Sequence, residues 1–401
     1  MPDAQLPDAY AILNPKQPQC TYPYPELSGC AIGFKLAQAF GQYYDLDPAT
    51  EVYPFLDLVA VSLASDFVPL TGENRVLSYF GLQQLNAAPR MGLLALMNAL
   101  PSVEAYTIRD IVFGITPHLN AAGRLAHARI AVQLLTATQE RTALDRSEQL
   151  LALNQQRRDV ERGVLREAEA QIAQNIAFGE QRTVLLRGSD WHQGVLGIVA
   201  AKMVDQHHKP TVVVTEVHGR LVGSVRSVPG FNVYQALEQC ADLLVTFGGH
   251  PRAAGLTLKP QHWEAFVERF EGFAQQFLPP AQQTPVQPID AALKLEDISE
   301  PFWKILQQMA PFGPANMRPI FATQHVVDAG YSSVVKSRHL KLVVQPQQGG
   351  TPIKGIAFGQ AQHLERVRSR QPFELCYVVE LDRYKGGNAL QLNVRDLRFR
   401  Q

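Results

Sequence analysis

The segment FGGHPRAAG at residues 247–255 surrounds one histidine with small residues. Gly248 and Gly249 come directly before His250, and two alanines and a third glycine follow it. Residues without bulky side chains let the backbone approach a ligand closely, and backbone N–H groups bind phosphate oxygens well. A plain turn with a structural histidine is the alternative. Because a core rarely needs five small residues around one imidazole, we favour a phosphate-binding segment.

Two further segments place an arginine beside groups suited to the same anion. GSVRS at 223–227 has the pattern of a strand, so the two-residue alternation puts Ser224 and Arg226 on one face. In ITPHLNAAGRL, Asn120 and Arg124 are four residues apart and share one side if the segment is helical. Each arginine offers a planar fork of N–H donors that suits a phosphate. Alternatively, each could belong to a surface pair that contributes little.

Asp66 follows a long apolar run in the segment 57–75, DLVAVSLASDFVPLTGENR. A carboxylate at the interior edge of a domain is costly unless it is paired or bound to a metal ion. An ordinary aspartate at a helix end or in a turn explains the pattern as well, and the segment alone favours that interpretation.

Residues 188–203, GSDWHQGVLGIVAAKM, predict a strand that ends at Gly-Ser-Asp and a helix that begins near Gly194. The free N–H groups at the start of such a helix would face an anion. The alternative is an ordinary turn capped by Ser189 or Asp190, with Trp191 in the core. Taken alone, the segment favours this alternative.

Seven segments, in their order along the chain, resemble the RecJ family of bacterial exonucleases in the DHH phosphoesterase superfamily. They are LSGCAIGFKLAQAF, DLVAVSLASDFVPLTGENR, PHLNAAGRL, WHQGVLGIVAAKM, GSVRS, FGGHPRAAG and APFGPAN. The resemblance covers essentially all 401 residues. FGGHPRAAG alone would also suggest related phosphoesterases or the editing domain of alanyl-tRNA synthetase, whereas seven ordered segments are specific.

The resemblance implies a single-strand-specific 5′-to-3′ DNA exonuclease that uses two Mn²⁺ or Mg²⁺ ions and acts in DNA repair and recombination. Asp66 matches a catalytic metal ligand, and His250 matches the histidine beside the scissile phosphate. Arg124, Ser224 and Arg226 match residues that hold the terminal 5′ phosphate. The resemblance also implies single-stranded DNA as the substrate, and a single-strand-binding protein and a RecQ-type helicase as partners.

The family's other metal ligands are missing from this sequence. They lie in an Asp-x-Asp motif, a second isolated Asp and an Asp-His-His motif, and His207-His208 is not that motif because Gln206 precedes it. Four prolines near the start, between Pro15 and Pro25, also suggest a strap whose anchoring element is absent. We therefore expect a chain that lacks the N-terminal part of the family's catalytic domain.

One carboxylate cannot organise two divalent ions, so a non-catalytic module that binds single-stranded nucleic acid is the main alternative function. Hydrolysis of small nucleotides by a related phosphoesterase is a third possibility. It is disfavoured because such enzymes need no appended basic barrel.

The length and the 46% of apolar residues predict two or three domains with cores of their own, and they exclude a disordered or disulfide-rich chain. Four cysteines without a CxxC pair match no zinc pattern. Neither an export signal nor a membrane-spanning stretch is present, so we expect a cytoplasmic protein and no membrane partner.

Positive charge is concentrated near the C-terminus, although Lys plus Arg and Asp plus Glu both number 37. Residues 330–401 hold 12 Lys and Arg against 5 Asp and Glu, which points to nucleic acid or to a merely solvated basic surface. Lys336, Arg338 and Lys341 lie beside one predicted strand. Arg383 and Lys385 lie on a predicted hairpin.

The apolar periodicity predicts the elements that position these residues. Residues 29–44 predict a buried helix that is capped by Ser28 and has Ile32, Leu36, Ala39 and Phe40 on its inner face, and residues 138–178 predict one long amphipathic helix. Strands are expected at 182–188, 209–217, 219–227, 319–327, 339–345, 352–358, 373–381 and 389–399.

The expected fold class is α/β with four parts. They are a partial DHH catalytic domain at 1–137, a long connecting helix at 138–180, a mixed α/β DHH-associated domain at 181–278 and, after a proline-rich linker at 279–288, a β-barrel of the oligonucleotide-binding (OB) type at 289–401.

Overall fold

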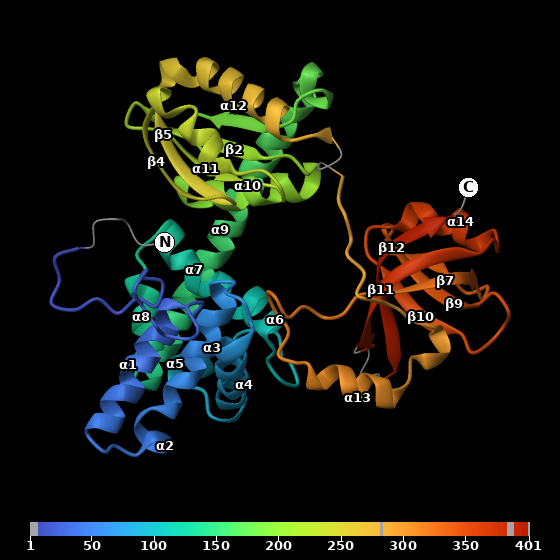
Figure 1. Cartoon of the computed structure of the whole chain (residues 1–401), viewed down its shortest axis with the longest axis horizontal. Coiled ribbons are helices and arrows are strands. Elements are labelled where there is room, and N and C mark those ends of the chain that lie inside the picture. The colour runs from blue at the N-terminus through green and yellow to red at the C-terminus, as the bar shows by residue number, and fades with distance from the viewer. Residues whose placement is uncertain (1–6, 281–283, 383–388, 400–401) are drawn as a thin grey trace. The chain divides into compact units, whose positions relative to one another are not determined.

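The computed structural model describes residues 7–280, 284–382 and 389–399, and the chain forms two compact units. The first unit comprises residues 1–88, 105–111 and 287–401. The second unit comprises residues 89–104 and 112–286. In Figure 1 the N-terminal helices of the first unit, α1 to α4, are blue and its barrel is orange to red, whereas the sheet of the second unit is green to yellow.

The N-terminal part of the first unit is helical. Its helices are α1 (Gly29–Tyr43), α2 (Pro48–Glu51), α3 (Leu56–Ser65), α4 (Gly72–Ala87) and α6 (Ile108–Asp110). α3 packs against both α1 and α4. The predicted cap of α1 is confirmed, because the hydroxyl of Ser28 accepts a hydrogen bond from the N–H of Ala31 at 3.2 Å.

The prediction of which face of α1 is buried is wrong. Leu36 and Phe40 are 59% and 56% exposed, whereas Ala31 and Phe34 are buried. Apolar residues lie on more than one side of this helix. A period of 3.6 residues groups them into faces but does not tell which face the neighbouring elements cover.

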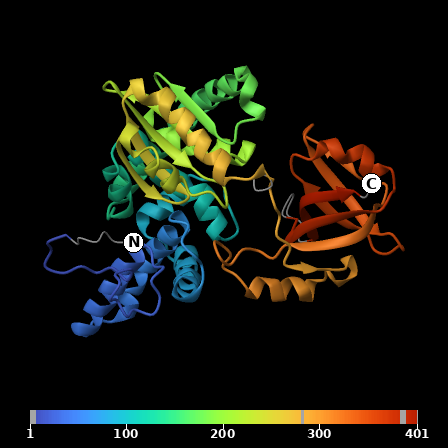
Figure 2. The same cartoon turned by 45° about the horizontal axis from the view of Figure 1, so that its top comes forward.

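The C-terminal part of the first unit is a closed five-stranded barrel, seen from a second direction in Figure 2. Its strands run in the order β7-β11-β12-β10-β9, and β9 pairs again with β7. Their bounds are β7 (Phe321–Asp328), β9 (His339–Pro346), β10 (Ile353–Ala357), β11 (Phe373–Leu381) and β12 (Leu390–Phe399). All five strands predicted for this part are confirmed.

Short elements complete the barrel. They are β6 (Ala291–Ala292), α13 (Glu300–Gln308), β8 (Ser333–Val335) and α14 (Leu364–Arg368). The two strands were not predicted because two or three residues are too few to show an alternation. The loop APFGPAN follows α13 and packs on the helices of the same unit, where the N–H of Leu70 donates to the carbonyl of Pro314 at 2.7 Å.

A long helix organises the helical part of the second unit. The helices are α5 (Met91–Asn98), α7 (Thr116–Leu125), α8 (Arg129–Leu135) and α9 (Glu140–Gln174). α9 has 35 residues, or about 50 Å at 1.5 Å per residue, and contacts the other three. Figure 1 shows it running from this group toward the sheet of the same unit.

The helix predicted over 138–178 is confirmed except at its C-terminal end. Asn175 leaves the helix, and its side chain accepts a hydrogen bond from the N–H of Ala177 at 3.1 Å. Asparagine competes in this way with the backbone bonds of a helix. Ile176, which the periodicity assigned to the helix, is fully exposed in the turn that follows.

A mixed sheet with helices on both faces forms the rest of the second unit. Its strand order is β1-β2-β3-β5-β4, with β1 and β2 parallel and the other neighbours antiparallel. The elements are β1 (Val184–Gly188), α10 (Gln193–His207), β2 (Thr211–Val217), β3 (Arg220–Arg226), α11 (Val233–Glu238), β4 (Leu244–His250), β5 (Ala253–Leu258) and α12 (Trp263–Phe277). The three strands and the helix predicted up to residue 227 are confirmed, with ends shifted by one to three residues.

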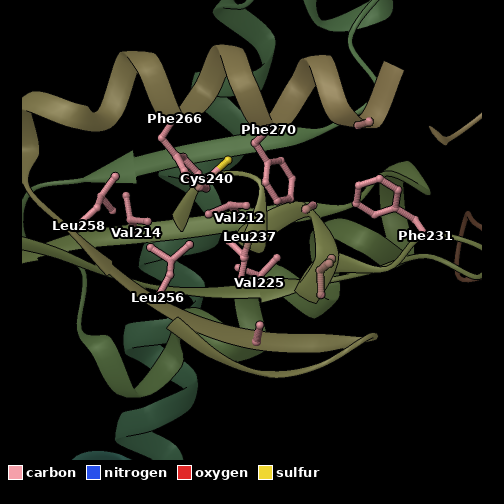
Figure 3. Packing of buried hydrophobic residues seen from close by; sticks show 14 of the residues in the cluster. Val212, Val214, Val225, Phe231, Leu237, Cys240, Leu256, Leu258, Phe266 and Phe270 are labelled. Carbon is pink, nitrogen blue, oxygen red and sulfur yellow. The ribbon is translucent and has the colours of Figure 1, made fainter. Parts of the chain in front are cut away.

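The alternation along β2 explains the three layers. Val212 and Val214 belong to the core formed with Phe266 and Phe270 of α12, which crosses above the strands in Figure 3. Val213 points the other way and belongs to the core formed with α9 and α10. The sheet therefore holds α10 in a fixed position against β2 and β3.

In the part of the chain that the structure describes, every helix is too short or too polar to cross a bilayer.

Candidate anion-binding site

A pocket of about 310 Å³ lies in the second unit where the end of α7, the start of α10 and β3 meet. It is lined by Gly123, Arg124, Gln193, Gly194, Leu196, Val222, Gly223 and Ser224. We call these residues, together with Arg226, the anion pocket. Three elements that are far apart in the sequence therefore contribute to one concave site.

Arg124 enters the anion pocket from the last turn of α7. Its Nη1 donates a hydrogen bond to the carbonyl of Gly194 at 3.0 Å, which ties α7 to the first turn of α10. The predicted helix that would align Asn120 with Arg124 is confirmed. Asn120 is exposed and does not line the pocket, so its role in phosphate binding stays a prediction.

Ser224 and Arg226 come from β3 and lie on one face of the strand, as the alternation predicted. Arg226 Nη1 donates to the hydroxyl of Ser224 at 2.8 Å and to the carbonyl of Val225 at 2.8 Å. Both side chains are partly buried. The guanidinium therefore fixes the serine hydroxyl at the wall of the pocket.

Arg124 is close enough to Arg226 to disfavour its charge. Burial lowers the pKa of Arg226, and the charge of Arg124 lowers it further. Burial also lowers the pKa of Arg124, as does Arg157, whereas Glu161 raises it. Two guanidinium groups that share a partly dehydrated site are stabilised by an anion between them. The electrostatics of the pocket thus favour an anion.

A buried carboxylate on α9 compensates part of this positive charge. Glu161, whose side chain is 5% exposed, accepts a hydrogen bond from Arg157 at 2.5 Å and forms an ion pair with Lys202 of α10. Sequence analysis did not identify Glu161. The four-residue spacing from Arg157 is visible in the sequence, but this spacing is typical of exposed pairs on a helix surface.

The start of α10 lines the anion pocket with Gln193 and Gly194. The predicted cap at Ser189 or Asp190 is wrong, since His192 caps the helix by accepting from the N–H of Gly194 at 3.1 Å. Ser189 bonds to Asp190 instead, at 3.0 Å. Trp191 is buried, as the alternative interpretation of this segment expected. The positive end of the helix dipole lies at the pocket and favours an anion there.

The segment FGGHPRAAG forms the β4–β5 hairpin. Gly248 faces Gly255, and a β-carbon at Gly249 would lie 2.4 Å from the carbonyl oxygen of Ala253. The φ angle of Gly249 is 145°, which favours glycine. Gly248, Gly249 and His250 are exposed on an edge strand and do not line the anion pocket. Their contact with a phosphate stays a prediction.

Asp66 lies in the first unit, where it ends α3 as an exposed C-cap. Its Oδ2 accepts a hydrogen bond from the hydroxyl of Ser62 at 3.1 Å. Among the residues that the structure describes, no three His, Cys, Asp or Glu side chains gather to hold a metal ion. The described residues thus do not fit a two-metal site by themselves. The metal-ligand role of Asp66 stays a prediction.

The barrel of the first unit carries a second candidate surface. Lys336, Arg338 and Lys341 are exposed in and beside the turn between β8 and β9. Phe358 follows β10 and is 58% exposed, and its ring centroid lies 5.2 Å from that of His339. Exposed aromatic rings among cations suit single-stranded nucleic acid. Sequence analysis missed Phe358, and the predicted cations Arg383 and Lys385 lie outside the described residues.

Comparisons with known proteins agree on one family. A family model described as the RecJ OB domain matches residues 289–396, and one described as the DHHA1 domain matches residues 180–276. The chain is 34% identical to the single-stranded-DNA-specific exonuclease RecJ of Haemophilus influenzae over 98% of this chain and 71% of that protein. It is 33% identical to the Bacillus subtilis RecJ over 90% of this chain and 45% of that protein.

Solved structures are similar as well. The crystal structure of Thermus thermophilus RecJ in complex with Mn²⁺ has a TM-score of 0.86 and 25% identity, over 100% of this chain and 57% of that chain. The same protein in complex with Mg²⁺ has a TM-score of 0.81. The expectation of Mn²⁺ or Mg²⁺ agrees with these relatives. The chain spans little more than half of the solved protein.

Proposed function

The chain belongs to the RecJ family of single-stranded-DNA-specific exonucleases, and on that premise we propose that its anion pocket binds the 5′-terminal phosphate of a DNA strand. The observation that carries the proposal is the convergence of Arg124, Arg226 and Ser224 on the first turn of α10. A terminal phosphate monoester carries about 1.5 to 2 negative charges at pH 7. An internal phosphodiester carries one, so two guanidinium groups favour the strand end.

For the whole protein, the proposed reaction is stepwise hydrolysis of single-stranded DNA from the 5′ end, in DNA repair and recombination. Holding the terminal phosphate fixes the position of the strand end, and this determines which phosphodiester bond is hydrolysed next. In this proposal Asp66 keeps its predicted role as a metal ligand, and His250 keeps its predicted role beside the scissile phosphate. A bound Mn²⁺ or Mg²⁺ pair would activate a water and stabilise the leaving oxygen. The described residues supply no complete ligand set for it.

The barrel is proposed to bind the same strand through its backbone and bases. Lys336, Arg338 and Lys341 supply positive charge for phosphates, and Phe358 offers a ring on which a base can stack. The resemblance to the family further supports a single-strand-binding protein and a RecQ-type helicase as partners, and the cytoplasm as the compartment. These three belong to the proposal.

A non-catalytic module that binds single-stranded nucleic acid is the second candidate function. It is favoured by the lack of any metal-holding group within the described part of the chain. The anion pocket and the barrel surface would then bind DNA in the same way without cleaving it.

The proposed function can be tested by binding three matched oligonucleotides that carry a 5′ phosphate, a 5′ hydroxyl or a 3′ phosphate. EDTA prevents cleavage, so fluorescence anisotropy reports binding alone. We expect the 5′-phosphorylated strand to bind most tightly and inorganic pyrophosphate to remove this preference. Equal affinity for all three strands would contradict the proposed pocket. Because we expect no digestion by the 401-residue chain itself, Mn²⁺ is then added to a version in which the family's missing metal-ligand segment precedes residue 1. Shortening of the oligonucleotide by that version would support the exonuclease over the non-catalytic module.

A further inference from the structure

The side of α10 that faces the anion pocket carries two glycines, Gly194 and Gly197, at helical spacing. A β-carbon at Gly197 would lie 2.7 Å from Arg226 Nη2 and 3.1 Å from Ser224 Oγ. Non-bonded contacts of real β-carbons are essentially never shorter than 3.0 Å. Gly197 therefore leaves the space in which both anion-binding side chains of β3 lie.

We propose that Gly197 is a specificity-determining positioning residue, whose missing side chain lets Ser224 and Arg226 lie against the first turns of α10. The inference rests on the proposed binding of a terminal phosphate. Arg226 Nη1 already bonds to Ser224 and to the carbonyl of Val225, so its guanidinium plane is fixed by two contacts. The backbone of α10 at Gly197 packs against the same guanidinium group from a third side.

The neighbouring glycine has a different role. A β-carbon at Gly194 would lie 2.2 Å from the carbonyl oxygen of Arg124, which is backbone and cannot move aside without shifting α7. The atoms near Gly197 are the ends of two side chains, which can rotate away. Adding a methyl group at Gly194 should therefore disturb the fold. Adding one at Gly197 should displace the anion-binding groups and leave the fold intact.

Helix propensity makes the two effects separable. Glycine is the least favourable residue in a helix interior apart from proline, and alanine is the most favourable. Gly197→Ala should therefore keep or raise the melting temperature while it weakens selectivity for the strand end. If Gly197 had a merely structural role, its replacement by alanine would lower the melting temperature and the selectivity together.

The experiment compares three glycine-to-alanine variants of the full chain. Gly197→Ala tests the inference. Gly272→Ala is the matched control, because it lies in α12 of the same unit and a β-carbon there meets nothing within 4 Å. Gly194→Ala is the control for a backbone clash. Each variant is measured for its melting temperature and for its affinity, in EDTA, for oligonucleotides with a 5′ phosphate and a 5′ hydroxyl.

We expect Gly197→Ala to reduce the ratio of the two affinities by about tenfold, which corresponds to one hydrogen bond from a charged donor. Gly272→Ala should leave the ratio unchanged, and neither variant should melt earlier than the wild type. An unchanged ratio in Gly197→Ala would overturn the inference. The inference would also be overturned if Gly197→Ala melted as early as Gly194→Ala, or failed to fold as that variant does. If the wild type itself shows no preference, the proposed function fails instead.

Discussion

Replacing Arg226 by alanine should weaken binding of strands with a 5′ phosphate far more than binding of strands with a 5′ hydroxyl. The change removes one of two guanidinium groups in the anion pocket and releases the hydroxyl of Ser224 from its bond at 2.8 Å. Arg226 is partly buried, so water replaces its contribution incompletely. Arg124→Ala should act in the same direction, and it also breaks the bond to the carbonyl of Gly194.

The expected size follows from the bonds that are lost. A hydrogen bond from a charged donor contributes about 1.5 to 3 kcal/mol, and 1.4 kcal/mol changes affinity about tenfold. Affinity for the 5′-phosphorylated strand should therefore fall by about 10- to 100-fold in Arg226→Ala. A strand with a 5′ hydroxyl does not place this group in the pocket, so its affinity should fall by less than about threefold, the share left to general electrostatic attraction.

Fluorescence anisotropy with both oligonucleotides in EDTA measures this difference. Arg220→Ala is the matched control, because Arg220 begins the same strand, carries the same charge and is exposed outside the anion pocket. The control corrects for the loss of one positive charge from the second unit. An equal loss of affinity for both oligonucleotides in Arg226→Ala would refute the reasoning and make Arg226 a structural residue.

Three further outcomes are expected. Replacing Lys336, Arg338 and Lys341 together by alanine should lower the magnitude of the slope of log affinity against log salt by about 2, at about 0.7 per phosphate contact on a single strand; an unchanged slope and affinity would mean that this barrel surface does not bind DNA. Glu161→Gln should lower the free energy of unfolding in urea by about 3 kcal/mol, since it removes the carboxylate of a buried pair; a loss below about 0.5 kcal/mol would contradict this. The 401-residue chain should digest single-stranded DNA with Mn²⁺ no faster than with EDTA, since the described residues gather no metal ligands, and rapid Mn²⁺-dependent shortening would overturn that expectation.

Strands were predicted well because their pattern is local. In β9 and β11, buried residues alternate with exposed ones or run continuously between turn residues, and such segments leave few alternatives. The long helix α9 was equally clear, since no proline interrupts it. The C-terminal end of this helix was not predicted correctly. The side chain of Asn175 can accept a hydrogen bond from the turn that follows, and this competes with continuation of the helix at a similar energy.

The orientation of α1 and the surroundings of Glu161 could not be predicted, because both depend on other elements. Leu36 and Phe40 have the spacing of a buried face, but neighbouring helices cover the side that carries Ala31 and Phe34. Glu161 is one of several acidic residues on α9, and its ion pair with Lys202 depends on how α10 packs against α9. Such facts become available only when tertiary contacts are known.

Glycine shows most clearly where inference from sequence ends. The pair Gly248-Gly249 was assigned to the approach of a phosphate, yet Gly249 lies opposite Ala254 in the β4–β5 pairing, where a β-carbon would clash with Ala253 and Ala254. Gly197 was not predicted as a functional residue. A glycine in a helical sequence indicates that a side chain is missing, but not which atoms occupy the space. In the structure that space holds Ser224 and Arg226. The role of such a glycine depends on the side chains opposite it, so Gly197 can be recognised only once β3 and α10 are seen together.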